Sequence, residues 1–337
     1  MQKREIVTRA LNFRDMPYVP WHFKFTVEAR EKVLNYLADR DIEEYLQNHI
    51  LELGDDVGFF KHLGDDLYQD VFGVIWDRSI DKDIGNVRGY LLPEPSLKGY
   101  AFPDPRDKRY FKDIPGKIEK YGDRFRLYAM GFSLFERAWT MRGMENLLTD
   151  FCLNPDFVHE LMESITQYNL EQIDEALKYD IDGIELGDDW GQQRGLIMGY
   201  DMWKEFIYPY LKRTYRFIKD RGKYVFIHSC GDVDELFDDL ADIGVDCFNP
   251  FQPEVMDVRA LLKQYHRKLS FWGGLSIQRI LPYGSVDDVI RETRELIEAG
   301  KEGGYIFAPS HAVEGDAPVE NIIAFIETAV SQPGFRV

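Results

Sequence analysis

The sequence predicts an α/β protein folded as a (β/α)8 TIM barrel, and three observations support this fold class. Short β-branched or aromatic segments alternate with amphipathic segments along the 337 residues, which is typical of a parallel sheet covered by helices. About eight such units are present, and eight units close most simply as a barrel. Several apolar segments end in polar residues, as barrel strands do at an active site. A doubly wound open sheet is the competing fold, but no Gly-x-Gly-x-x-Gly motif follows any strand.

The predicted strands share β-branched and aromatic residues and end in polar residues or glycine. They are expected at 18–26, 71–76, 126–131, 181–187, 224–228, 245–250, 268–274 and 303–309. The first of these alternates so that His22 and Lys24 share one face, opposite Trp21 and Phe23. In a barrel one of those faces points inward, so His22 is a candidate pocket residue, although a packed histidine is an equally good interpretation.

The predicted helices carry apolar residues at helical spacing. They are expected at 1–16, 27–48, 155–179, 201–221, 234–243, 285–300 and from 319 onward. A further helix, after Arg137, is expected to carry Met141, Met144, Leu147 and Leu148. Asp201 and Ser285 are plausible N-caps, Gly222 is a plausible stop, and Pro318 suits a helix start.

Residues 80–115 are rich in Pro, Gly and Asp and show little periodicity. A long irregular segment of this kind is usually an insertion over a site rather than a linker. With no internal repeat in the sequence, we expect one barrel domain over residues 1–337 with this insertion.

Composition limits the partners and the compartment. The formal net charge of −18 argues against nucleic acid, because a phosphate backbone would be repelled. No apolar run approaches the roughly 20 residues needed to span a bilayer, and the first residues lack a signal-peptide core. Three cysteines make no disulfide framework. We therefore expect a cytoplasmic protein without membrane or nucleic-acid partners.

The segment His228-Ser229-Cys230-Gly231 ends the strand at 224–228. His228 and Cys230 are two residues apart, so on a continuing strand their side chains point to the same face. An imidazole and a thiolate that converge in this way form half of a zinc site. A buried cysteine beside a satisfied core histidine is the alternative interpretation.

Further candidates follow the other strands. Glu185, Asp188 and Asp189 place three carboxylates within five residues, which is costly unless positive charge lies nearby. We predict His22, Glu185 and Asp188 as catalytic residues from their positions in the barrel. For the same reason we predict that four amide side chains orient the substrate: Gln192, Asn249, Gln252 and Gln278. Hydrogen bonding within loops is the alternative role for each.

These segments together resemble the uroporphyrinogen decarboxylase superfamily. The resemblance rests on His228-Ser229-Cys230-Gly231, on Gly273-Gly274-Leu275-Ser276-Ile277-Gln278 and on residues 303–321 with Pro318-Val319-Glu320-Asn321. It implies a (β/α)8 barrel. It also implies one of two activities, decarboxylation in haem synthesis or methyl transfer linked to zinc and cobalamin.

Two departures bear on that choice. Decarboxylases of the superfamily carry an Arg-Gln-Ala-Gly-Arg segment after the first strand, whereas residues 22–30 here contain no arginine pair. The His-x-Cys-Gly motif instead resembles the zinc site of the methyltransferase branch, such as methylcobalamin:coenzyme M methyltransferase. That branch has a third ligand, a cysteine, near the last strand, where this chain has Ser310-His311. His311 either replaces the cysteine or matches a decarboxylase Gly-His that binds no metal.

The resemblance therefore implies a zinc-dependent methyltransferase with His228, Cys230 and His311 as metal ligands. Glu185 or Asp188 is a candidate fourth ligand, since a carboxylate would neutralise the site. The cofactors would be Zn²⁺ and a methylcobalamin or other corrinoid carried by a partner protein. The substrate would be a small thiol or a methoxylated compound.

Two alternatives remain open at this stage. One is a metal-independent decarboxylase for a tetrapyrrole or smaller acid, with His311 and Asp77 facing the substrate. The other is a corrinoid- or tetrapyrrole-binding module without catalysis. The sequence names neither the substrate nor the oligomeric state.

Overall fold

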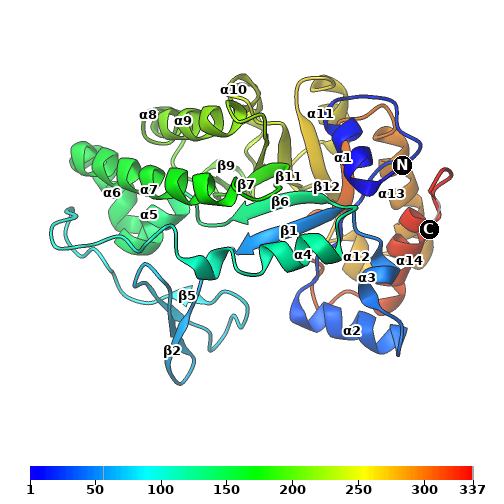
Figure 1. Ribbon diagram of the computed structural model, residues 1–337, viewed down its shortest axis with the longest axis horizontal. Coiled ribbons are helices and arrows are strands. Elements are labelled where there is room, and N and C mark those ends of the chain that lie inside the picture. The colour runs from blue at the N-terminus through cyan, green and yellow to red at the C-terminus, as the bar shows by residue number, and fades with distance from the viewer. Residues whose placement is uncertain (56, 336–337) are drawn as a thin grey trace.

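The computed structural model describes residues 1–55 and 57–335. Its centre is a curled parallel sheet of seven strands, ordered β1-β6-β7-β10-β11-β12-β13 (Figure 1). These strands are β1 (Ile50–Asp55), β6 (Phe125–Met130), β7 (Gly183–Gly187), β10 (Tyr224–His228), β11 (Cys247–Phe251), β12 (Ser270–Leu275) and β13 (Tyr305–Pro309). The α/β class and the parallel sheet of the predicted fold are confirmed.

The segment expected as the first strand, 18–26, is not a regular strand. It forms isolated parallel bridges, Trp21 with Phe307 and Phe25 with Val313. Its backbone still contacts both edges of the sheet: the Phe307 N–H donates to the Pro20 carbonyl, and the His49 N–H donates to the Trp21 carbonyl. Pro20 removes one ladder donor, which is one reason why pairing here stays local.

Helices pack around the outside of the sheet (Figure 1). Those before β6 are α1 (Lys3–Leu11), α2 (Val27–Leu37), α3 (Ile42–Leu46), η1 (Lys108–Tyr110) and α4 (Ile114–Lys120). Those between β6 and β10 are α5 (Phe135–Arg142), α6 (Met144–Leu153), α7 (Pro155–Ala176), α8 (Tyr200–Phe206) and α9 (Tyr208–Lys219). The remaining ones are η2 (Asp234–Leu236), α10 (Phe237–Asp242), α11 (Val258–Gln264), α12 (Ile280–Tyr283), α13 (Val286–Ala299) and α14 (Val319–Val330). None of the helices described is long and apolar enough to cross a membrane.

Several helix predictions need correction and one N-cap prediction is confirmed. The helix expected at 27–48 is divided into α2 and α3, and the helix expected to carry Met141 to Leu148 is divided at Gly143 into α5 and α6. The helix expected at 201–221 is broken into α8 and α9, because Pro209 cannot supply an N–H to a continuous helix. Gly199, not Asp201, precedes the first turn of α8. Ser285 does cap α13, in a capping box with Asp288.

The insertion is longer and more ordered than the sequence indicated: in the structure it extends over residues 57–115, not only 80–115. It contains a four-stranded antiparallel sheet ordered β2-β3-β4-β5, with strands β2 (Lys61–Gly64), β3 (Leu67–Gln69), β4 (Ile75–Asp77) and β5 (Asn86–Val87), of which only β5 lies within 80–115. The apolar run at 71–76 therefore contributes to this small sheet and not to the central one. In Figure 1 the small sheet projects below the central sheet, away from both chain termini.

Period-two alternation divides the inside of the central sheet into layers. An apolar cluster with Leu127, Phe226, Cys247 and Ile306 fills the sheet interior. The next inward positions along these strands are Ala129, His228, Asn249 and Ala308, and all four line a cavity above that cluster. The same alternation that packs the core thus delivers polar side chains to the carboxyl ends of the strands. A two-stranded hairpin, β8 (Gly191–Gln192) and β9 (Gly195–Leu196), follows β7 beside this end.

Candidate metal centre

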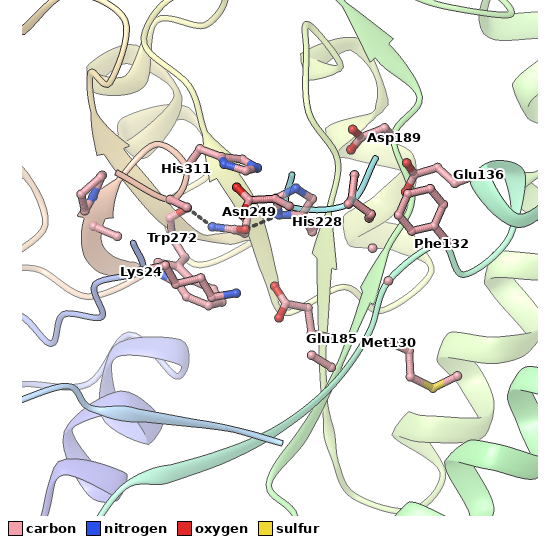
Figure 2. A pocket seen from close by; sticks show the side chains of 18 of the residues that line it. Lys24, Met130, Phe132, Glu136, Glu185, Asp189, His228, Asn249, Trp272 and His311 are labelled. Atoms are coloured by element: carbon pink, nitrogen blue, oxygen red, sulfur yellow. Dashed lines mark hydrogen bonds between the residues drawn. The ribbon is translucent and has the colours of Figure 1, made fainter. Parts of the chain in front are cut away.

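A cavity of about 490 Å³ opens at the carboxyl ends of the strands (Figure 2). This volume is within the range of small-molecule sites. Its base is formed by side chains from β7, β10, β11 and β12, and its mouth by the insertion and the segment after β13. The lining includes Glu185, His228, Asn249, Trp272 and His311.

Three metal-ligating side chains converge here. One ligand atom each from His228, Cys230 and His311 lies within 4.8 Å of the other two. The His228 Nε2 atom is 3.5 Å from the Cys230 sulfur. Tetrahedral zinc with Zn–N of about 2.05 Å and Zn–S of about 2.3 Å separates its nitrogen and sulfur ligands by roughly 3.5 Å. The spacing of this histidine and cysteine therefore fits a shared zinc ion.

Asn249 fixes the tautomer of His228. Its Nδ2 group donates to the Trp272 carbonyl at 3.0 Å, so its Oδ1 atom is the one that faces His228. That oxygen lies 2.6 Å from His228 Nδ1, which must then carry the proton. The lone pair is left on Nε2, the atom beside Cys230. A hydrogen bond that orients a ligating imidazole in this way is a regular feature of metal sites.

The loop that carries Cys230 is held by its backbone. The Cys230 N–H donates to Asp189 Oδ1 and the Gly231 N–H donates to Gln252 Oε1, both at 2.7 Å. Gly231 has φ of +87°, and a Cβ there would lie 2.3 Å from the Gly191 carbonyl carbon. Glycine is therefore required at this turn, and the loop and the β8–β9 hairpin fix each other's position.

The electrostatics around the cysteine favour a bound cation. Burial raises the pKa of the Cys230 thiol, and the carboxylates of Asp189 and Glu136 raise it further. Burial together with Asp189 and Asp188 holds the pKa of Glu136 well above its usual range. Desolvation and the nearby His228 lower the pKa of His311 to about 4, so this imidazole is neutral at pH 7 and available as a ligand. A divalent ion would offset the negative charge that otherwise disfavours the thiolate.

A second polar group lies across the cavity. His22 Nε2 is 3.6 Å from Glu52 Oε2, and Lys24 forms an ion pair with the same carboxylate. Burial raises the pKa of Glu52, but Lys24 and His22 outweigh it and hold that pKa well below its usual range. The edge of the His22 ring meets Trp272, with ring centroids 5.4 Å apart. This group borders a second cavity of about 440 Å³, which shares Lys24 with the first.

Comparison with known proteins identifies the family of the chain. The sequence profile of uroporphyrinogen decarboxylase (URO-D) matches residues 102–331. The chain belongs to the uroporphyrinogen decarboxylase family. The superfamily resemblance read from the motifs is thereby confirmed.

Two curated relatives and one solved structure extend the comparison. A methylated-thiol–coenzyme M methyltransferase of Methanosarcina mazei is 23% identical over 199 residues, 59% of this chain and 51% of its own. A uroporphyrinogen decarboxylase of Anaeromyxobacter dehalogenans is 25% identical over 191 residues, 55% of this chain and 51% of its own. The chain thus spans about half the length of the curated relatives it matches. A solved methyltransferase from Methanosarcina mazei superposes with a TM-score of 0.74 at 16% identity, over 98% of both chains.

The URO-D chain brings some predicted residues to the cavity and not others. Glu185, His22 and Asn249 line it, together with His228 and His311. Asp188 does not: it is fully buried and accepts hydrogen bonds from the N–H groups of Leu134, Phe135 and Glu136. A carboxylate at a helix N-terminus is favoured by the helix dipole. Asp188 therefore caps α5, and neither its predicted catalytic role nor a role as fourth ligand is supported.

The other amide side chains also have positions that differ from the prediction. Gln252 supports the Gly231 turn, and Gln192 accepts from the Asp232 N–H through its backbone carbonyl. Gln278 is exposed in the turn after β12. Asp77 pairs with Arg88 in the insertion at 3.7 Å and does not line the cavity. Of the four predicted amide side chains, only Asn249 lines the cavity, and there it orients the His228 ring.

The sequence reasoning missed Glu136, Asp189 and Glu52. Asp189 belongs, like Asp188, to the group of three carboxylates at one strand end. The alternation of side chains along a strand does not predict which way a side chain points beyond the last paired residue, so the two could not be distinguished. Glu136 stands in the first turn of α5, the helix that follows β6 after a short loop, and this position was the available signal. Glu52 lies in β1, a strand that the sequence analysis did not separate from its surroundings.

Proposed function

We propose that the chain is a zinc-dependent methyltransferase of the URO-D family. It would move a methyl group between a corrinoid carried by a partner protein and a small thiol or methoxylated substrate. The observation that carries this proposal is the convergence of His228, Cys230 and His311, with one ligand atom each within 4.8 Å of the others. Family membership and the methyltransferase relatives support the same conclusion.

The roles of the chain's own residues follow from their contacts. His228 and Cys230 would hold the ion on the loop fixed by Asp189, Gln252 and Gly231. His311 would complete the set from the segment after β13, and the fourth position is left for substrate. Zinc bound there would lower the pKa of a thiol or polarise an ether oxygen, which eases breaking or making of the bond to the methyl group.

Glu185 and His22 line the cavity within reach of a bound substrate and are the proposed polar contacts. Asn249 would act through His228, as a positioning residue.

The decarboxylase alternative has less support from the cavity. A substrate with several carboxylates needs bidentate arginine contacts. The residues that line the central cavity, among those the structure describes, include no arginine and six carboxylates. A binding module without catalysis would not need three side chains that can coordinate zinc within reach of one ion.

The test combines metal content with methyl transfer. We expect about one zinc per chain in protein purified without added metal, and its loss in His228→Ala and Cys230→Ala. Cys152→Ala is the matched control, because Cys152 is exposed on α6, away from the cavity. Retention of zinc in His311→Ala would remove His311 from the ligand set.

Transfer is followed from the absorbance change of methylcobalamin in the presence of a panel of small thiols. The proposal predicts activity in the wild type and in Cys152→Ala, and none in Cys230→Ala or after chelation. Release of CO₂ from a carboxylic substrate by fully chelated protein would contradict it and favour the decarboxylase alternative.

A further inference from the structure

The charge of the cavity lining is strongly one-sided. Six carboxylates line it: Asp81, Asp83, Glu136, Glu185, Asp189 and Glu314. Lys24 is the fixed cation of the described lining, and it is already paired with Glu52. Glu136 is left out of the charge count, because its pKa is held well above its usual range. A zinc ion bound by one thiolate would add a single net positive charge, so the other five carboxylates still leave a negative excess.

The mouth of the cavity is also acidic, and its carboxylates come from two separate segments of the chain. Asp83 and Asp81 come from the insertion, and Glu314 comes from the segment after β13. Burial raises the pKa of Glu314, and so do the charges of Asp83, Asp316, Glu28 and Asp81, in that order. Carboxylates brought together from opposite sides of an entrance focus a negative potential on whatever passes between them.

Three cations of the neighbouring segments, Lys32, Arg78 and Lys82, are not among the lining residues, and the first two are engaged elsewhere. Lys32 donates to the carbonyl oxygens of Gly315 and Ala317. The Arg78 guanidinium stacks over Phe60 and Tyr68, 4.3 and 4.7 Å from the ring centroids. Lys82 is exposed and is not part of the lining.

Aromatic walls complete the cavity. Trp272 and Phe132 lie on opposite sides of it in Figure 2. Phe132 has φ of +49°, a conformation that non-glycine residues seldom adopt, and it lines the wall between β6 and α5. Aromatic faces next to carboxylates are the usual means by which proteins bind alkylated ammonium groups. The Lys24 ammonium already lies over the Trp272 ring, 5.4 Å from its centroid, so Phe132 is the wall that is left for a ligand.

Building on the proposed function, we propose that this cavity selects a small methylated substrate that carries a positive charge. An alkylated ammonium group would lie between Phe132 and the carboxylates. A carboxylate or sulfonate of the same shape would meet the other five carboxylates of the lining and would be rejected.

The test uses three compounds of one shape and different charge on the zinc-loaded protein: choline, 3,3-dimethylbutan-1-ol and 3,3-dimethylbutanoate. Calorimetric titration should show choline binding at least about tenfold more tightly than the neutral alcohol, from cation–π and charge contacts. The anion should bind more weakly than the alcohol. Added salt should weaken choline binding and leave the alcohol unchanged, because only charge contacts are screened.

A variant pair locates the effect. Asp83→Asn/Glu314→Gln removes two charges at the mouth and should reduce the choline preference by about threefold or more, as exposed charges contribute modestly. Asp220→Asn/Glu298→Gln makes the same change in net charge on exposed helix ends, at Asp220 after α9 and Glu298 in α13, and should leave the preference unchanged.

Equal binding of the three compounds, or tighter binding of the anion, would overturn the proposal. If the two double variants changed the preference for choline equally, the proposed role of the mouth carboxylates in selecting a cation would be overturned. These titrations contain no methyl carrier, so they succeed or fail independently of methyl transfer.

Discussion

The base and the mouth of the cavity are built in different ways. At the base, His228 and Asn249 project from neighbouring strands and are hydrogen-bonded to each other, and Asn249 also donates to the β12 backbone. At the mouth, Asp83 and Glu314 are exposed and come from segments between regular elements. The base therefore suits chemistry that needs fixed geometry, whereas the mouth suits selection by charge, which tolerates movement.

The insertion below the mouth is nevertheless anchored. Asp70 accepts from the N–H groups of Phe72 and Val74, from Trp76 Nε1 and from Arg137 of α5. Both members of the Asp70–Arg137 pair are buried. The exposed mouth is thus attached through a buried ion pair to α5, the helix that bears Glu136.

The largest effect is expected at this attachment. Asp70→Asn should lower the free energy of unfolding by about 3–5 kcal/mol, because it leaves a buried guanidinium without its counter-charge. Asp77→Asn in the same insertion breaks a pair that is more exposed and 3.7 Å apart, and should cost less than about 1 kcal/mol. Urea unfolding of both variants checks this. Similar losses in the two would show that the insertion is not anchored through Asp70.

The next effect concerns the base. Asn249→Ala removes the acceptor that fixes the His228 tautomer and should weaken zinc affinity about 10- to 100-fold. Competition with a chromophoric chelator measures this change. Gln278→Ala, at an exposed turn that the sequence had placed at the site, is the control and should bind zinc as the wild type does. An unchanged affinity in Asn249→Ala would break the argument for a preorganised base.

The smallest effect is a pH dependence at Glu136. Its pKa in the folded chain is raised above the unfolded value, so the folded state keeps a proton that the unfolded state loses. Stability of the metal-free protein should therefore fall as the pH rises from about 4.5 upward. Glu136→Gln should reduce this fall between pH 5 and pH 8, as measured by urea unfolding at each pH. A fall of the same size in the variant would show that Glu136 is not the group responsible.

The sequence predicted the base of the site better than its surroundings. His228 and Asn249 could be placed because both lie inside paired strands, where the period of two fixes the side-chain face. Asp188 and Asp189 could not be told apart, because they follow the last residue of β7. Which of them caps a helix depends on where α5 begins, 52 or more residues earlier in the chain.

The fold shows the same division. Strand composition predicted the parallel sheet, since buried parallel strands are continuous apolar runs. It failed at 18–26, whose aromatic residues pack as a strand would while the backbone forms only isolated bridges. It also assigned 71–76 to the main sheet, because composition does not say with which strand a segment pairs.

X-ray absorption at the zinc edge, on the purified wild type and on Cys230→Ser, tests the central claim most directly. The account predicts one sulfur at about 2.3 Å and imidazole nitrogens at about 2.0–2.1 Å in the wild type, with the sulfur absent in the variant. A zinc shell of oxygen and nitrogen alone, identical in both proteins, would contradict it.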